Sequence, residues 1–454
     1  MISEARSLAQ TFGPIKTIKR KFSNYVVGSC LAKWHTGDSD VDAIYAKNWA
    51  NSMARIDAGG KRHFRLLAKI AVARQVIDGD IFAQKTKSAD GYAQVRLIEA
   101  DRVNNGMLYA PDTDDMVGGV KLGPNKTPIG IRVTERDRFG QFRNPTDLPI
   151  SSVVHYYDPM RVDGVRGVTE LDTALNSIRD LKEIIDAERS AVKLNGKIAL
   201  IMKSVTGGAS GRNAWASSAT TGSDSTGSGN DVYVEDINDA MTRYMFPNED
   251  VKAHQPSRPG GDWLQFAQFL IQMIATGVDL PYGLVWSMIG TGPAVRHEIK
   301  AAERTFRAKT DLLEDMFIKP IVAYVTSVDI DAGRIPFHEN WSNFSIPKPA
   351  SISIDAGRDS KSGLDEIAQG VGTATAWCED EGLDFEQMVW TKGREAALYR
   401  EVADQYGVSI DEIRIIPGRQ AANATQTTDS EETSDMETET EDSADNATDP
   451  EGED

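Results

Sequence analysis

Few side chains in this sequence of 454 residues have the types and spacing that catalysis requires. The nearest match to a phosphate-binding loop, G-x-x-x-x-G-K-[ST], is Gly118 to Thr127 (GGVKLGPNKT), but no glycine stands directly before Lys126 as the motif requires, so a turn is the better interpretation. His297 and Glu298 begin the zinc pattern H-E-x-x-H without its second histidine. Asp279 and Glu298 are a carboxylate pair of the kind used in acid–base catalysis, but with 68 Asp and Glu in the chain, solvated side chains are favoured. We therefore expect no enzyme, cofactor or metal site.

The negative charge of the chain is concentrated at one end. The formal net charge is −18, yet the segment from Asp429 to Asp454 holds 13 Asp and Glu and no Lys or Arg, so the remainder carries −5. This disfavours a protein that grips nucleic acid over its whole surface. Cys30 and Cys378 are too few for a disulfide framework. Without an apolar run of ~20 residues or a signal peptide at Met1, we expect a cytosolic chain without membrane contact.

The first 167 residues combine helical and strand patterns. The basic run Lys19-Arg20-Lys21 suits a contact with DNA or a partner, although a solvated face is the favoured interpretation. Helices are predicted over 48–58 and 62–73, with a break at Gly59-Gly60. Short segments rich in β-branched residues predict strands over 75–83, 93–99 and 129–133. Together they indicate an α+β unit that ends near Arg166-Gly167.

Two helices with apolar stripes flank a stretch of low complexity. The first stripe has steps of three and four residues and comprises Leu171, Ala174, Ile178, Leu181, Ile185 and Val192, with a stop at Gly196. The second runs from about Asp262 to Gly277 and comprises Trp263, Phe266, Ala267, Leu270, Met273 and Ile274. Residues 204–230 between them are rich in Ser, Gly and Thr, which is typical of a mobile linker. Each helix needs a partner to bury its apolar face.

A loop and a long helix follow. The loop spans Tyr282 to Pro293, and the stripe of the long helix comprises Val295, Ile299, Ala302, Phe306, Leu313 and Met316. Lys309 interrupts this stripe, and Pro320 should kink or end the helix. Polar helices are predicted over 356–372 and 385–406. Beyond Gln420 almost no apolar residue is larger than alanine, so disorder is expected.

Three phrases carry a family resemblance. They are Val95-Arg-Leu-Ile-Glu-Ala-Asp-Arg-Val, the segment from Pro149 to Val168 with its Arg-Gly pair, and the segment from Phe266 to Lys300, which contains Ile274-Ala-Thr-Gly-Val-Asp-Leu-Pro-Tyr-Gly-Leu. In this order they resemble lambda-type portal proteins of tailed bacteriophages, and residues 370–396 are similar to the C-terminal region of that family. One phrase departs: where the family has Tyr-Ser-Ser-x-Arg, this chain has Gly292-Pro-Ala-Val-Arg and keeps only Arg296. The role of that phrase is therefore not carried over.

The resemblance implies an α+β portal-protein fold with a wing, a helical stem, a small loop and β clip, and a helical crown, assembled as a ring of usually twelve subunits. On that plan the N-terminal wing is 1–165, the stem helices are 166–196 and 259–278, the clip is 197–258, the tunnel loop is 279–293, the long helix with the C-terminal wing is 294–350, the crown-like region is 351–419, and the disordered acidic tail is 420–454.

The same resemblance points to three groups of functional residues. Side chains of the tunnel loop would touch passing DNA sterically, without reading bases: Trp286, Ser287, Met288, Ile289, Gly290 and Thr291. The alternative for Trp286 is simple packing under the loop. Lys182, Arg189 and Lys193, on the polar side of the first stem helix, would meet phosphates or form intersubunit salt bridges. Trp215 would dock a partner at the clip or pack locally.

The function implied is a ring-shaped DNA channel at one capsid vertex. Duplex DNA would pass it without sequence specificity, packaged by a terminase large subunit and later ejected, and the other partners would be further copies of the chain, the major capsid and scaffolding proteins and head–tail adaptors. The protein would lie in the virion, and in the host cytoplasm during assembly. The alternative is another virion assembly protein without a channel, favoured if the third phrase does not form a helix, a loop and a long helix. An enzyme would need a site motif, and none is found.

Overall fold

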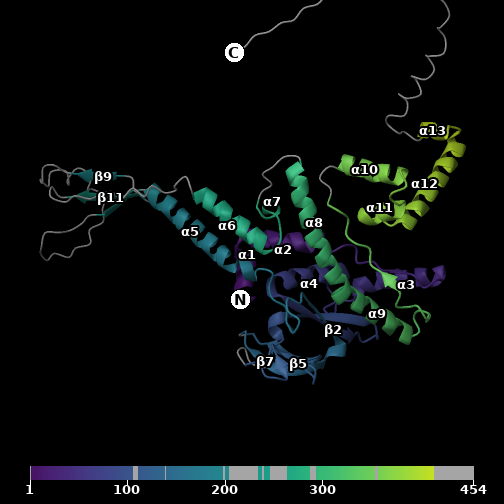
Figure 1. The fold of residues 1–454 in the computed structure, drawn as a ribbon, viewed down its shortest axis with the longest axis horizontal. Coiled ribbons are helices and arrows are strands. Elements are labelled where there is room, and N and C mark those ends of the chain that lie inside the picture. The colour runs from purple at the N-terminus through teal and green to yellow at the C-terminus, as the bar shows by residue number, and fades with distance from the viewer. Residues whose placement is uncertain are drawn as a thin grey trace, which may run out of the picture. The chain divides into compact units, whose positions relative to one another are not determined.

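The computed structural model describes residues 2–105, 111–138, 140–197, 200–203, 234–237, 240–245, 263–286, 293–352 and 356–413. The chain forms two units, residues 1–384 and 385–454. Its fold is mixed α+β (Figure 1), as the sequence predicts. None of the helices in the described ranges has both the length and the apolar character to span a membrane.

The larger unit opens with four helices that lead into a three-stranded sheet. The helices are α1 (Ile2–Thr11), α2 (Gly13–Tyr25), α3 (Ser39–Arg55) and α4 (Phe64–Asp78). The antiparallel sheet has the order β3-β2-β8, with β2 (Asp80–Lys87) between β3 (Ala93–Glu99) and β8 (Val153–Tyr157).

The strand predicted from Gln75 is wrong at its start. Residues 75–78 form the last turn of α4, and the strand begins only after Gly79, whose positive φ of 94° ends the helix. The side chains of Val76 and Ile77 are buried in the core. Tertiary packing therefore outweighs the β propensity of these two residues.

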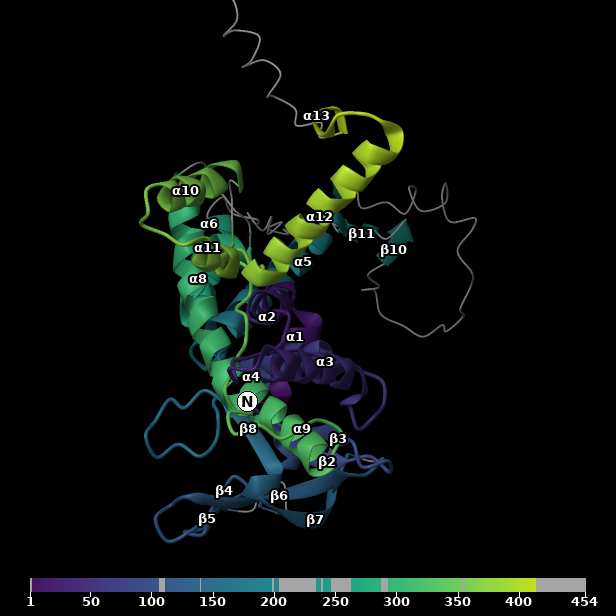
Figure 2. The same cartoon turned by 90° about the vertical axis from the view of Figure 1, so that its right-hand side faces the viewer.

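A second, four-stranded sheet completes the α+β part (Figure 2). Its order is β4-β5-β6-β7, formed by β4 (Met116–Val117), β5 (Val120–Leu122), β6 (Pro128–Arg136) and β7 (Phe142–Pro149). Only part of β6 is predicted from the sequence. A separate apolar cluster joins this sheet to β2 and β3, with Phe82, Ile98, Val120 and Ile131 at its centre. The short strands β1 (Lys33–Trp34) and β12 (Phe344–Ser345) pair elsewhere in the unit.

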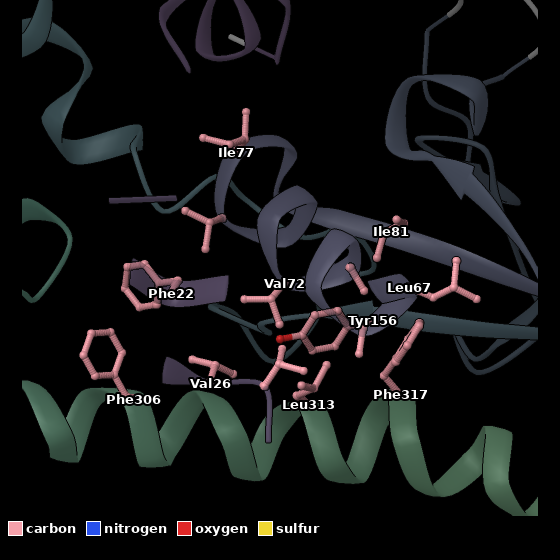
Figure 3. Close-up of a cluster of buried hydrophobic side chains, with 14 of the residues drawn as sticks. Phe22, Val26, Leu67, Val72, Ile77, Ile81, Tyr156, Phe306, Leu313 and Phe317 are labelled. Atoms are coloured by element: carbon pink, nitrogen blue, oxygen red, sulfur yellow. The ribbon is translucent and has the colours of Figure 1, made fainter. Parts of the chain in front are cut away.

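One long helical segment crosses the main core. It consists of α8 (Pro293–Leu313), a π-helical turn (Glu314–Ile318) and α9 (Lys319–Asp331). Its side chains Phe306, Leu313 and Phe317 point toward α4 and β8 (Figure 3). Pro320, predicted to kink or end the helix, instead lies in the first turn of α9. The wider π turn before it accommodates the missing N–H, so the segment continues.

A buried ion cluster fixes the end of the α+β part. Arg166 donates to Asp80 (Nε to Oδ2, 2.5 Å; Nη2 to Oδ1, 3.1 Å) and to the carbonyl oxygens of Ala100, Val103 and Gly118. A single guanidinium thus joins β2 to the segments leading into the second sheet. Bidentate geometry and burial make such a pair costly to break.

His155 completes this cluster. Its ring stacks between Phe82 and Tyr157, with centroids 4.1 and 4.2 Å away, and its Nε2 lies 3.2 Å from Asp80 Oδ2. Burial lowers the pKa of His155, although Asp80 opposes this change. Burial alone would raise the pKa of Asp80, but the Arg166 charge and the hydrogen bonds from His155 and Arg166 lower it to about 2.

Acid should therefore destabilise the chain in two steps. A lowered His155 pKa means that protonation favours the unfolded chain, so stability is lost as pH falls below about 6.5. A lowered Asp80 pKa contributes stability above about pH 4 that is lost as pH falls toward 2. Chemical unfolding at successive pH values measures both steps. His155→Phe, which keeps an aromatic ring in the stack, should flatten the slope between pH 5 and 6.5; an unchanged slope would contradict the assignment.

Candidate functional site

The two helices predicted as a stem lie side by side (Figures 1 and 2). They are α5 (Leu175–Lys197), preceded by a 3-10 turn (Asp172–Ala174), and α6 (Trp263–Gly277). The buried residues include Ile178 and Leu181 on α5 and Leu270 and Ile274 on α6. The prediction that Val192 extends the buried stripe is wrong, since this side chain is 53% exposed. With 23 residues, α5 is longer than the 15-residue α6.

A second apolar face on α6 has no cover within the described chain. Phe266, Phe269 and Met273 are each about half exposed, and the rings of Phe266 and Phe269 stack at 6.3 Å. Leu264 is equally exposed but lies on the opposite side of the helix. The prediction that Phe266 and Met273 share the stripe of Leu270 and Ile274 is therefore wrong. At 100° per residue, positions 266, 269 and 273 form a separate line. A helix that is apolar nearly all round is normally buried all round.

The segment after α6 is built to hold a tight turn. The Oγ1 of Thr173 donates to the Gly277 carbonyl (2.9 Å), and a Cβ on Gly277 would lie 3.0 Å from that Oγ1. Asp279 has a φ of 54°, and its carboxylate accepts a hydrogen bond of 2.9 Å from Thr305 on α8. Asp279 is thus a turn residue tied to the long helix, and Glu298 is exposed.

The predicted tunnel loop begins where the short helix α7 (Tyr282–Val285) ends. Trp286 is 53% exposed, so the described chain does not bury it under the loop. The rest of the predicted contact set, Ser287, Met288, Ile289, Gly290 and Thr291, lies outside the described residues, as does Trp215. The third phrase does contain a helix (α6), a turn and the start of a long helix (α8), the order of elements that the resemblance to portal proteins implies.

The predicted stem cations Lys182, Arg189 and Lys193 are all exposed. Their spacings of seven and four residues place them along one line of α5. Arg189 lies 3.9 Å from Asp186 on the same helix, a weak surface pair. The line is available to an external anion or to a carboxylate of another chain.

From the sequence alone, Lys309 is only an interruption of an apolar stripe. In the structure it ties α8 to the connection between β8 and α5. Its Nζ lies 2.6 Å from Asp158 Oδ2 and also donates to Glu170, which accepts a second hydrogen bond of 2.8 Å from Gln75. Burial alone would lower the pKa of Lys309, but Glu170 and Asp158 raise it. A single lysine within an apolar helical stripe is the one feature of the sequence that indicates this buried ion pair.

Lys309→Met should destabilise the larger unit by about 3 kcal/mol, because it leaves two carboxylates without their buried cation. The comparison is Lys300→Met on the same helix, whose side chain is 65% exposed and pairs only with Glu303. That change should cost below about 1 kcal/mol. Denaturant unfolding of the two variants measures the difference, and equal losses would show that the Lys309 pairs contribute no more than a surface bridge.

A family model described as phage portal protein, lambda family, matches residues 1–290. The chain belongs to this family. A curated relative, the portal protein of Escherichia phage N15, is 21% identical over 391 residues, which are 79% of this chain and 73% of the relative. The function is accordingly that of a phage portal protein, and the alternative of an adaptor or other assembly subunit is set aside.

Matches among solved structures come from gene transfer agent particles. The neck of an empty particle with C6 symmetry has 11% identity and a TM-score of 0.45, covering 84% of the portal chain and 94% of the other chain. The neck of a native particle with C12 symmetry has 12% identity and a TM-score of 0.41, with 84% and 93% covered.

Proposed function

We propose that this portal protein assembles into a closed ring of twelve copies at one capsid vertex, and that the ring conducts duplex DNA during packaging and ejection. The observation that carries the proposal is the second apolar face of α6. A single chain covers one side of α6 with α5 and leaves Phe266, Phe269 and Met273 half exposed on another. Contact with a neighbouring copy buries them, and repetition of one such head-to-tail contact closes a ring.

The regions take the roles that the family plan gives them. The α5–α6 pair is the stem, residues 197–258 are the clip, and the segment from α7 to Pro293 presents Trp286 and its neighbours to passing DNA. The crown contains α10 (Ala356–Ala368) and α11 (Ala374–Asp380) with α12 (Phe385–Tyr406) and α13 (Ile410–Ile413). The wing comprises the two sheets with α1–α4 and α9. Lys182, Arg189 and Lys193 face either phosphates or carboxylates of the adjacent copy.

The partners follow from that position in the particle. The clip receives the terminase large subunit during packaging and head–tail adaptors afterwards, while major capsid and scaffolding proteins surround the ring during assembly in the host cytoplasm. The portal works without catalysis of its own, so the terminase supplies the energy for DNA movement. Two observations support the lack of catalysis. The sequence contains no catalytic motif, and Asp279, a candidate acid–base residue, instead holds a turn by its hydrogen bond to Thr305.

The test is negative-stain electron microscopy of the purified full-length chain, with mass measurement of the same sample. Rings of twelve copies with an axial hole are the expected result. A stable monomer under all assembly conditions would overturn the ring, and steady ATP hydrolysis by the purified protein would overturn the absence of catalysis.

A further inference from the structure

Helices α2 and α4 lie in two segments that carry positive charge and almost no carboxylate, the exception being Asp78 at the end of α4. The segments 5–37 and 58–77 hold six and five Lys or Arg, and neither contains Asp or Glu, in a chain whose net charge is −18. The sequence alone left the run Lys19-Arg20-Lys21 as a solvated face. The structure adds a second basic segment beside it, because α2 packs against α4.

Contacts along the pair show that the two helices run antiparallel. Ser23 on α2 donates to the carbonyl of Lys69 on α4 (3.3 Å), and Lys69 Nζ donates to Asn24 (3.1 Å). At the other end, burial together with the charges of Arg74 and Lys16 lowers the pKa of Lys19. Cations from both helices are therefore neighbours on one face, which we call the α2–α4 basic face: Lys16, Lys19, Arg20, Arg65 and Lys69.

The described part of the chain does not neutralise these charges. Among the described residues, Lys16, Lys19, Arg20 and Arg65 have no ion pair, whereas Arg74, at the edge, pairs with Asp78 and Glu99. Crowded like charges without counter-charges raise the free energy of the free protein, and a bound polyanion removes that cost.

The features of the face distinguish between classes of polyanion. Leu66 is the one large apolar side chain exposed on α2 and α4, whereas the centre of a protein interface is normally apolar. No aromatic ring is offered for base stacking, since Tyr25 stacks on Phe306 at 5.1 Å. The 13 residues of α2 span about 20 Å, the length of about six phosphates along one DNA strand.

We infer that the α2–α4 basic face binds the phosphate backbone of duplex DNA from outside, without a free DNA end. The inference rests on the proposed function, in which the chain handles duplex DNA, and adds a contact that needs no passage through a bore. Binding is independent of sequence because flexible Lys and Arg side chains meet only phosphates.

The experiment uses the full-length oligomer and a relaxed, covalently closed DNA circle, which a preformed closed ring cannot thread. Binding is measured by mobility shift over a series of salt concentrations. The test variant combines Lys16→Gln, Lys19→Gln, Arg20→Gln and Arg65→Gln. The matched control removes the same charge from exposed crown positions through Lys361→Gln, Lys392→Gln, Arg394→Gln and Arg400→Gln.

The test variant should bind the circle at least about tenfold more weakly at 0.1 M salt. The slope of log affinity against log salt should fall by about 3 to 4, since each phosphate contact contributes about 0.9. The control should match the unmodified protein. Equal binding by the test variant would overturn the inference, as would a loss of binding to the major capsid protein with DNA binding unchanged, which would make the face a protein interface.

The outcomes separate this inference from the proposed function. If rings form and pass linear DNA while circles do not bind, the outside contact fails and the portal role stands. If no ring forms, the ring proposal fails, and the two variants still report on the basic face, because both helices belong to each single chain.

Discussion

Phe269→Glu is expected to abolish ring assembly while leaving the fold of each subunit intact. In a single chain this side chain is 51% exposed, so the subunit does not depend on it for its own core. In the proposed ring contact the remaining half would become buried, about 100 Å² of apolar surface worth about 2.5 kcal/mol per contact. A glutamate there loses this term and also buries an unpaired carboxylate. The association constant of each contact should fall at least about a hundredfold.

Mass measurement and electron microscopy check this result, and far-UV circular dichroism checks the fold of the subunit. Val162→Glu is the control, because Val162 is fully exposed in a loop of the α+β part and is not on α6. Rings at unchanged protein concentration with glutamate at position 269 would show that the second face of α6 is not the intersubunit contact.

Gly167→Ala should destabilise the larger unit by about 3 kcal/mol or more. A Cβ at position 167 would lie 2.1 Å from the carbonyl oxygen of Gly79, which is backbone and has no rotamer to change. Moving residue 167 also displaces Arg166 from Asp80 and its three carbonyl partners. In the Arg-Gly pair of the family phrase, Arg166 thus joins several segments by hydrogen bonds, and Gly167 allows its backbone to contact the backbone of Gly79.

Gly13→Ala is the matched control, because a Cβ at that position has no neighbour within 4 Å. Urea unfolding, followed by a signal from the larger unit, should show that the free energy of unfolding of this variant changes by less than about 1 kcal/mol. A similarly small change for Gly167→Ala would mean that the two glycine backbones separate without cost.

The sequence predicted the elements whose patterns are long and regular. The helices containing Ile178, Leu270 and Phe306 repeat apolar residues over several turns, and each appears in the structure. The predicted strand begins too early, at Gln75, because a short run of Val and Ile gives the same sequence pattern at a buried helix end as in a strand. The strands β4 and β5, of two and three residues, are too short for a periodic signal and depend on pairing with β6.

The candidate site was less predictable because it depends on contacts between distant segments. Exposed Phe269 and buried Leu270 are adjacent apolar residues on α6, and only the position of α5 distinguishes them. The partners of Lys309 lie 139 and 151 residues away, at separations for which one sequence holds no signal. The basic run at Lys19 was visible, but its continuation at Arg65 required the antiparallel packing of α2 and α4.

The π turn before Pro320 has a consequence for insertions and deletions. A π turn holds one residue more than an α turn of the same height, so Glu314–Ile318 accommodates one extra residue within a continuous helical segment. Deleting one residue there restores ordinary α geometry while Phe306 and Val325 keep their orientation toward the core. The same deletion two turns earlier would rotate one end of the helix by about 100° relative to the other. Among divergent portal chains, length changes of a single residue in this helix should therefore be tolerated at the π turn and selected against elsewhere along it.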